Sequence, residues 1–182
     1  MLIKFKNHSP KLGQNVFVAE GAKIIGEIEI GDESSIWFNC VLRADVNFIK
    51  IGKRTNIQDL STVHVWHREF DEKGKLKDAG FPTIIGDDVT IGHNCVIHAC
   101  VIKNRVLIGM NAVIMDNALI EEDSIVGAGS VVTKGKKFPL RSLILGNPAK
   151  FVRELNDEEV SFLKQSALNY VDFKNEFLKD LQ

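Results

Sequence analysis

An aliphatic residue returns every six positions along most of this chain. The series begins at Val18, is interrupted between about residues 66 and 83, and runs on to Val132, with a slip of three residues at 48–50 and a loss of one after Ile97. A period of six fits neither an amphipathic helix, with its period of 3.6, nor the simple alternation of a strand. It is typical of a hexapeptide β-helix, in which each hexad forms one short strand and one corner.

The position four residues after each aliphatic one is small or β-branched. This second series comprises Ser34, Cys40, Thr55, Ser61, Val89, Cys95, Ala112 and Ser130. A narrow core needs such residues beside a stack of large ones, because voids and overpacking both cost stability. An ordinary β-sandwich is the alternative, but about fourteen hexads in near register are hard to obtain by chance. We therefore expect an all-β solenoid, a parallel β-helix of hexapeptide repeats.

Outside the repeat the chain predicts three other segments. Residues up to about 17 read as an unspecific lead-in, and residues 66–83 are charged, contain glycine and proline, and read as an excursion loop. After Val132 the repeat fades. These boundaries predict a β-helix domain over residues 1–155.

A C-terminal amphipathic helix is expected over residues 156–182. Asn156 or Asp157 offers an N-cap, and the acidic residues that follow suit a first helical turn. Apolar residues then recur at roughly helical spacing until a predicted end near Leu181: Val160, Leu163, Ala167, Tyr170, Val171, Phe173, Phe177 and Leu178. This helix should pack on the β-helix or on a neighbouring subunit.

Composition narrows the function classes. The 182 residues carry a net charge of −1 with a pI near 6.5, which favours neither nucleic acid nor an anionic membrane surface. No apolar run approaches the roughly 20 residues that span a bilayer, and the first residues are too short an apolar segment for a secretory signal. Cys40, Cys95 and Cys100 lack CxxC spacing and suggest reduced thiols. A cytoplasmic protein is expected.

Three histidines occupy informative slots in the repeat. His64 and His98 each follow an aliphatic position, and their separation of 34 residues equals three hexads plus the 16-residue excursion. They therefore share one face in successive coils, where strands about 4.8 Å apart would let two imidazoles share a zinc ion. His93 belongs to the preceding hexad and to another face. We expect it to reach the pair of an adjacent subunit, in an assembly for which three-fold closure is natural.

The same columns place polar residues near these histidines. Arg43 lies below His64 and His98, and Asp59 occupies the slot of His93 one coil earlier, where a carboxylate can orient an imidazole. Asn56 and Gln58 are neutral hydrogen-bonding groups near the same edge. Two interpretations stay open for Arg43, Asp45 and Asp59, which either act in catalysis or form an ion-pair network at an interface.

The chain resembles the γ-class carbonic anhydrases and their bacterial homologues. The matching segments are LRADVN (42–47), IGKRTNIQDLSTVHV (51–65), residues 85–120, VGAGSVV and LILGNPAK. The resemblance implies a left-handed β-helix, a homotrimer and three zinc ions between subunits. By the same resemblance His64 and His98 come from one chain and His93 from the next.

The resemblance also implies roles and a reaction. Arg43 and Asp45 correspond to an interface ion pair, Asn56 and Gln58 to water-orienting groups, and Asp59 and Tyr170 to positions at or near the site. The implied reaction is the reversible hydration of CO₂ to bicarbonate by a metal-bound hydroxide, since zinc lowers the pKa of bound water to about 7. Three histidines also accept Fe²⁺ or Co²⁺.

One position departs from the family pattern. Founding members carry a glutamate three residues after the first histidine, whereas this chain has His67 there. A histidine with an unperturbed pKa of about 6.5 could shuttle protons, or it could be an exposed loop residue. Two other functions remain open: an acyl-CoA thioesterase or acyltransferase on the same scaffold, and a catalytically weak metal-binding trimer.

Overall fold

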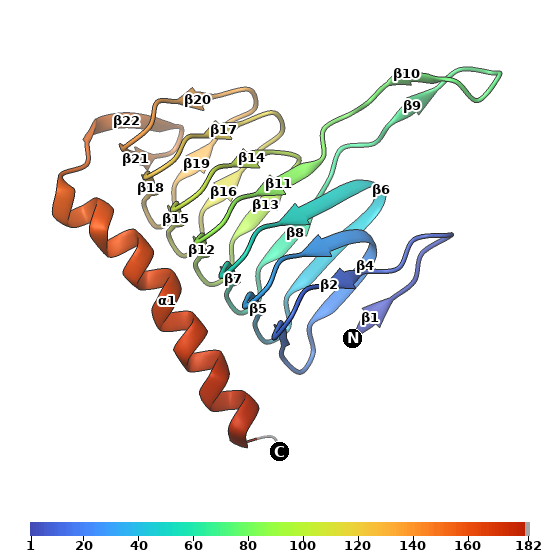
Figure 1. Cartoon of the computed structure of the whole chain (residues 1–182). Coiled ribbons are helices and arrows are strands. Elements are labelled where there is room, and N and C mark those ends of the chain that lie inside the picture. The colour runs from blue at the N-terminus through green and yellow to red at the C-terminus, as the bar shows by residue number, and fades with distance from the viewer. Residues whose placement is uncertain (181–182) are drawn as a thin grey trace.

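Parallel pairing in steps of three hexads builds the solenoid that the six-residue period predicts. In the computed structural model, which describes residues 1–180, Ile57 pairs in register with Ile36 on one side and Ile91 on the other. Each such step returns the chain to the same face one coil further along, so the strands stack into a parallel β-solenoid flanked by one C-terminal helix (Figure 1).

The register of the strands defines three faces. The first face contains β1 (Leu2–Ile3), the first parts of β4 (Lys23–Ile30) and β6 (Val41–Ile51), β8 (Thr62–His64), β13 (Val96–His98), β16 (Val113–Ile114) and β19 (Val131–Val132). The second contains β2 (Lys11–Leu12), the last parts of β4 and β6, β11 (Thr83–Ile85), β14 (Val101–Ile102), β17 (Leu119–Ile120) and β20 (Lys137–Phe138). The third contains β3 (Phe17–Val18), β5 (Ser35–Ile36), β7 (Asn56–Ile57), β12 (Thr90–Ile91), β15 (Leu107–Ile108), β18 (Ile125–Val126), β21 (Ser142–Gly146) and the antiparallel β22 (Ala149–Glu154).

The core is the aliphatic series itself. Most of the stacked isoleucines, such as Ile57, Ile91 and Ile108, are fully buried, and burying such a side chain contributes about 1.5–3 kcal/mol. The small residues predicted beside this stack are buried too, with Ser61 and Ala112 at 0 % exposure. The predicted two-size core is therefore confirmed.

The corners require the left-handed backbone region. Residues three after the aliphatic position have positive φ, among them Asn39 at 58°, Asn111 at 59° and Asp123 at 58°. Asn, Asp and Gly enter this region at the least cost, which explains why they recur at this slot. Gly109 is required for a different reason, since a Cβ there would lie 2.4 Å from the backbone nitrogen of Ala128 in the next coil.

The coils continue at both ends beyond the repeat that was recognised between Val18 and Val132. Leu12 pairs with Ile30 in β4, so the supposed lead-in already supplies strands of the first coil. After Val132, Phe138 and Ile144 continue the interval of six and pair in parallel with the preceding coil. Both extensions went unrecognised because the flanking residues are polar or irregular while the inward residue keeps its place.

The two irregularities of the repeat also have structural forms. The slip of three residues is a bulge in which residues 45–48 of β6 lie opposite the single residue Glu27 of β4. The excursion loop carries an antiparallel hairpin, β9 (Glu69–Phe70) and β10 (Leu76–Asp78), that projects from the solenoid (Figure 1). Thr83 already belongs to β11, so the loop is slightly shorter than predicted.

The C-terminal helix α1 spans Asp157–Asp180, and its predicted end near Leu181 lies outside the described residues. Asn156 caps it: its Oδ1 accepts from the Glu159 N–H at 2.8 Å, while Glu159 Oε2 accepts from the Asn156 N–H at 2.9 Å. The helix packs on β5 and β12, alongside the third face (Figure 1). The division into domains at residue 155 stays a prediction.

The buried side of α1 differs from the predicted apolar stripe. Leu163 and Ala167 are buried as expected, but Phe177 is 40 % exposed and Lys174 is fully buried. The Lys174 ammonium donates to Glu33 at 2.7 Å, in the second coil, and this pairing makes its burial tolerable. Within residues 1–180, no helix combines the length and the apolar character needed to cross a membrane.

Candidate metal centre

His64 and His98 face each other on neighbouring strands of the first face. The register of β8 and β13 pairs them directly, as the hexad count predicts. His64 Nδ1 and His98 Nε2 lie 3.1 Å apart, and the ring centroids lie 5.1 Å apart. Strand pairing alone therefore brings together two residues that are 34 positions apart.

Carboxylates hold the other nitrogen of each ring. His64 Nε2 lies 3.0 Å from Asp45 Oδ1, and His98 Nδ1 is hydrogen-bonded to Asp116 Oδ1. A carboxylate only accepts, so the hydrogen-bond network assigns the ring protons to these two nitrogens. His64 Nδ1 and His98 Nε2 are then left with lone pairs directed at one another, an arrangement that a shared cation would relieve.

This donor set fits a transition metal such as zinc. Two nitrogens bound at 2.0–2.1 Å in tetrahedral geometry lie roughly 3.3 Å apart. The observed separation of 3.1 Å between His64 Nδ1 and His98 Nε2 is close to that value. The carboxylates of Asp45 and Asp116 are the partners that metal-bound imidazoles commonly have on their other nitrogen.

Burial favours the neutral form of His64. Burial lowers the pKa of His64 below its ordinary value of 6.5, and the hydrogen bond to Asp45 only partly opposes this shift. Burial would raise the pKa of Asp45, but the hydrogen bonds from His64 and Arg43 outweigh it and lower that pKa. Arg43 Nη1 donates to Asp45 Oδ2, and the charge of Arg43 also lowers the pKa of His64 directly. A neutral imidazole beside an ionised carboxylate is suited to bind a metal.

His93 lies elsewhere, at the corner that follows β12 on the third face. Its Nδ1 is 2.7 Å from Asp59 Oδ2, and the Asn94 N–H donates to the Asp59 carbonyl at 2.8 Å. Asp59 Oδ1 also accepts from the Phe38 N–H at 3.2 Å, which fixes the carboxylate. His93 Nε2 is therefore left for another partner. The side chain of His93 is 46 % exposed.

The three histidines do not meet within one chain. Across residues 1–180, no cluster of three or more His, Cys, Asp or Glu side chains has a geometry that could hold a metal ion. The pair His64–His98 and the single His93 belong to different faces, joined by a corner of the coil. A site that uses all three needs a second chain.

Asn56, Gln58 and Tyr170 belong to the His93 side of the molecule. Asn56 and Gln58 are buried on and just after β7, and Gln58 Nε2 donates to Asn56 Oδ1 at 3.1 Å. Gln58, His93 and Tyr170 line one groove of about 410 Å³ between the third face and α1. Burial, with the nearby charge of Asp59, raises the pKa of Tyr170. The predicted site residues thus divide into two groups.

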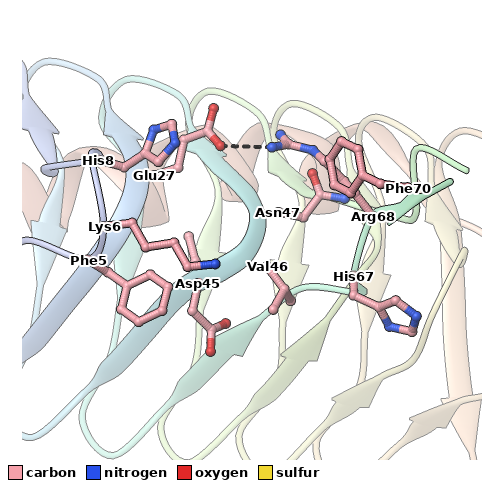
Figure 2. Close-up of a pocket in the computed structure, with 11 residues that line it drawn as sticks. Phe5, Lys6, His8, Glu27, Asp45, Val46, Asn47, His67, Arg68 and Phe70 are labelled. Carbon is pink, nitrogen blue, oxygen red and sulfur yellow. Dashed lines mark hydrogen bonds and ion pairs between the residues drawn. The ribbon is translucent and has the colours of Figure 1, made fainter. Parts of the chain in front are cut away.

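His67 lies in the excursion loop, where its side chain is 48 % exposed and its Nε2 is 3.5 Å from Glu69 Oε1. It stacks on Trp66, with ring centroids 5.1 Å apart, and Trp66 in turn lies beside His98, at 6.4 Å. Figure 2 shows His67 at one side of a pocket of about 360 Å³ that is also lined by Asp45. His67 is thus connected to the histidine pair through Trp66, which lies beside His98, and through the pocket that it shares with Asp45.

Two residues of this region were missed by the sequence analysis. Asp116 orients His98 from one slot beyond the column of the histidines, so column counting does not select it. Asn47 is buried in the β6 bulge, and its Nδ2 donates to the carbonyls of Trp66 at 3.0 Å and Ala79 at 2.8 Å, closing the base of the loop. The slip of three in the repeat was the available signal for Asn47.

Comparisons with known proteins agree with this fold. The family model described as bacterial transferase hexapeptide (six repeats) matches residues 99–134. A hexapeptide transferase family protein from Anaplasma phagocytophilum, of known structure, is 39 % identical and superposes with a TM-score of 0.88 over 97 % of this chain and 98 % of that one. This likeness extends over the whole solenoid and the helix.

Two relatives carry a more specific name. Gamma carbonic anhydrase 2, mitochondrial, of Arabidopsis thaliana is 43 % identical over 171 residues, which are 94 % of this chain and 59 % of the plant protein. This chain thus spans about three fifths of that relative's length. A carbonic anhydrase of Geobacillus kaustophilus is 39 % identical over 182 residues, which are 100 % of this chain and 93 % of that protein.

Proposed function

This chain belongs to the γ-class carbonic anhydrase family, and we propose that it catalyses the reversible hydration of CO₂ to bicarbonate at a metal site shared between subunits of a homotrimer. The observation that carries the proposal is the division of the site. Two imidazole nitrogens 3.1 Å apart are supported by Asp45 and Asp116 on one face, and a third imidazole supported by Asp59 lies on another.

In this proposal His64 and His98 of one subunit and His93 of its neighbour hold Zn²⁺, with Fe²⁺ or Co²⁺ as alternatives. The bound metal would lower the pKa of a coordinated water to about 7 and so supply hydroxide at neutral pH. Other side chains of the protein hold these ligands in place. Asp45, Asp116 and Asp59 fix the three imidazoles, and Arg43 holds Asp45 in place.

The amide of Gln58 is suited to orient the reacting water. Its nitrogen donates to Asn56, so its oxygen is turned toward the groove that it shares with His93 and Tyr170. An amide oxygen that reaches the groove is a good acceptor for a water hydrogen, and it would direct the lone pair of that water at CO₂. His67, half exposed at the edge of the loop, is our candidate for passing the released proton to buffer.

Exposed apolar side chains near both groups support a trimer. Leu60 and Met110 lie near His93 and are 59 % and 52 % exposed, and Val96 and Met115 lie beside the His64–His98 pair with 42 % and 37 % exposed. Apolar surface of this kind next to half of a metal site is favourable to bury against a second copy. Three-sided prisms packed side by side close naturally with three-fold symmetry. A cytoplasmic location stays a prediction.

The test combines metal analysis, mass measurement and stopped-flow CO₂ hydration on the purified protein. We expect a trimer with about one zinc per chain and a hydration rate that is lost when the metal is removed by a chelator and restored by zinc. A zinc-loaded trimer without hydration activity would contradict the proposal and favour a metal-stapled assembly.

An acyl-CoA thioesterase or acyltransferase is the second candidate. It is favoured by the hexapeptide transferase name of the similar structure and by the groove of about 410 Å³ along the third face. Thioester cleavage or acyl transfer by a protein that does not hydrate CO₂ would establish it. Acyltransfer on this scaffold needs only one histidine as a base, so it leaves the facing His64–His98 pair unexplained.

A further inference from the structure

Polar side chains occupy an unexpected place beneath α1. The outward slot just before the aliphatic position of the third face is Phe17 in the first coil and Leu107, Ile125 and Leu143 in the last three. Between them the same column holds Ser35, Asn56 and Thr90, all of them buried. Polar groups under a helix cost free energy unless they are hydrogen-bonded, so this interruption of an apolar column needs a cause.

Ser35 Oγ accepts from Trp37 Nε1, whereas Asn56 and Thr90 belong to one series of hydrogen bonds that begins on the helix. Ser166 Oγ of α1 lies 3.2 Å from Thr90 Oγ1, and Asn56 Nδ2 donates to Thr90 Oγ1 at 3.0 Å. Asn56 Oδ1 then accepts from Gln58 Nε2 at 3.1 Å. Every member of this series is more than nine-tenths buried.

One backbone carbonyl determines which atoms donate and which accept along this series of hydrogen bonds. Asn56 Nδ2 lies 3.4 Å from the Val89 carbonyl oxygen, which can only accept, so the amide nitrogen of Asn56 faces Val89 and Thr90. Its oxygen must then face Gln58, which turns the Gln58 nitrogen inward and the Gln58 oxygen toward the groove. Asn56 thus determines the orientation of the Gln58 amide, the group that is proposed to bind the reacting water.

We propose that Thr90 and Ser166 are positioning residues for the reaction, which hold Asn56 and through it the Gln58 amide in the orientation that accepts a hydrogen bond from water. This inference rests on the proposed function. It also assigns a role to α1, since Ser166 and Tyr170 are four residues apart on one side of the helix and both line the groove with Gln58. The orientation of the Gln58 amide then depends on the docking of α1, which brings Ser166 to Thr90.

Thr90→Val tests the proposal because valine keeps the shape of threonine and removes only the hydroxyl. We expect kcat for CO₂ hydration to fall about five- to tenfold, the value of one neutral hydrogen bond, with KM, metal content and trimer mass unchanged. Thr90→Ser restores the hydroxyl and should recover at least half of kcat. Ser166→Ala is the second variant and should lower kcat by a smaller factor. Ser161→Ala, an exposed serine of the same helix, is the matched control.

A double-mutant cycle separates positioning from general destabilisation. In a Gln58→Ala background, Thr90→Val should have no further effect on kcat, because the amide that it orients is gone. The proposal is overturned if the two effects multiply, or if Thr90→Val alone leaves kcat within twofold of the parent.

The side-chain amide of Gln58 gives a readout that does not need the reaction. With ¹⁵N-labelled glutamine, the Gln58 Nε2 hydrogens should be protected from solvent exchange in the parent, in Thr90→Ser and in Ser161→Ala, and should lose that protection in Thr90→Val. If the parent lacks hydration activity, the proposed function fails, and this measurement alone tests whether Thr90 orients the Gln58 amide through Asn56. Unchanged protection in Thr90→Val overturns the inference.

Discussion

The His64–His98 pair and the His93 corner both hold imidazole rings in place, but they differ in burial and in the number of side chains that orient the rings. The pair lies on two adjacent strands in direct register, and the side chains are 19 % and 30 % exposed with a carboxylate on each ring. His93 stands on a corner, 46 % exposed, with Asp59 as its one orienting partner in the described residues. The pair is organised by one chain, whereas the corner depends on what covers it.

The corner compensates by carrying the polar groups that the pair lacks. Gln58, Asn56 and Tyr170 are on its side, whereas the polar side chains described beside the His64–His98 pair are Arg43, Asp45 and Asp116. In the proposed function the pair supplies two of the metal ligands, and the groups around His93 orient the reactants. Neither group is a complete site for CO₂ hydration, so activity and assembly should depend on each other.

The largest expected effect comes from mixing two inactive variants. His98→Ala and His93→Ala should each lose metal and activity by more than about 100-fold, which is the upper range for the loss of a mere orienting group. After co-refolding in equal amounts, about a quarter of the interfaces combine an intact pair with an intact His93, and activity should return to that level. Stopped-flow hydration measures it.

The matched control is a mixture of His98→Ala with His64→Ala. Both substitutions destroy the same group, so no interface is intact and activity should stay absent. Recovery in this control, or none in the first mixture, would mean that the three histidines are not divided between chains as proposed.

The next largest effect is expected from substitutions of the carboxylates that orient the imidazoles, and it should differ between the pair and the corner. Asp116→Asn should weaken zinc binding by about 10–100-fold, because a neutral amide oxygen is a weaker acceptor for His98 Nδ1–H than the carboxylate. Asp59→Asn should cost less, since the ring of His93 is more exposed and water can replace part of the contact. Chelator competition gives both affinities. A larger loss for Asp59→Asn would reverse the comparison.

A smaller effect is expected at the excursion loop. His67→Ala should lower kcat by roughly tenfold in weak buffer and hardly at all in strong buffer, because external buffer can replace a proton shuttle. Hydration rates over a series of imidazole concentrations make the measurement. Equal rates for parent and variant at every concentration would leave His67 as an exposed loop residue.

The smallest effect concerns protonation of the pair. In metal-free protein, His64 should titrate below its ordinary pKa of 6.5, because burial disfavours the imidazolium. Asp45→Asn should lower its pKa further by removing the opposing charge and weakening the hydrogen bond. Its folded pKa is depressed, so the unfolded chain takes up the proton first and the contribution to stability falls as pH drops below 6.5. NMR titration of labelled histidine checks this. A pKa above 6.5 would contradict it.

Regular spacing explains what the sequence analysis predicted correctly. In a solenoid of constant period, a residue's face and height follow from counting, so the register of His64 with His98 and of Asp59 with His93 could be derived from separations of 34 residues. Counting fails where the period breaks. Asn47 acts from within a bulge, and Asp116 reaches His98 from a neighbouring slot by the direction of its side chain.

Helix α1 shows both what the sequence pattern determines and what only the tertiary structure decides. The chain's own pattern determined the six-residue coil, its two-size core, the capped start of the helix and the column shared by His64 and His98, because each depends on local periodicity or local chemistry. Only the tertiary structure decided that Lys174 is buried while Phe177 is exposed, and that Ser166 meets Thr90. Those outcomes depend on the rotation at which the helix docks, and rotation is decided by the surface that receives it.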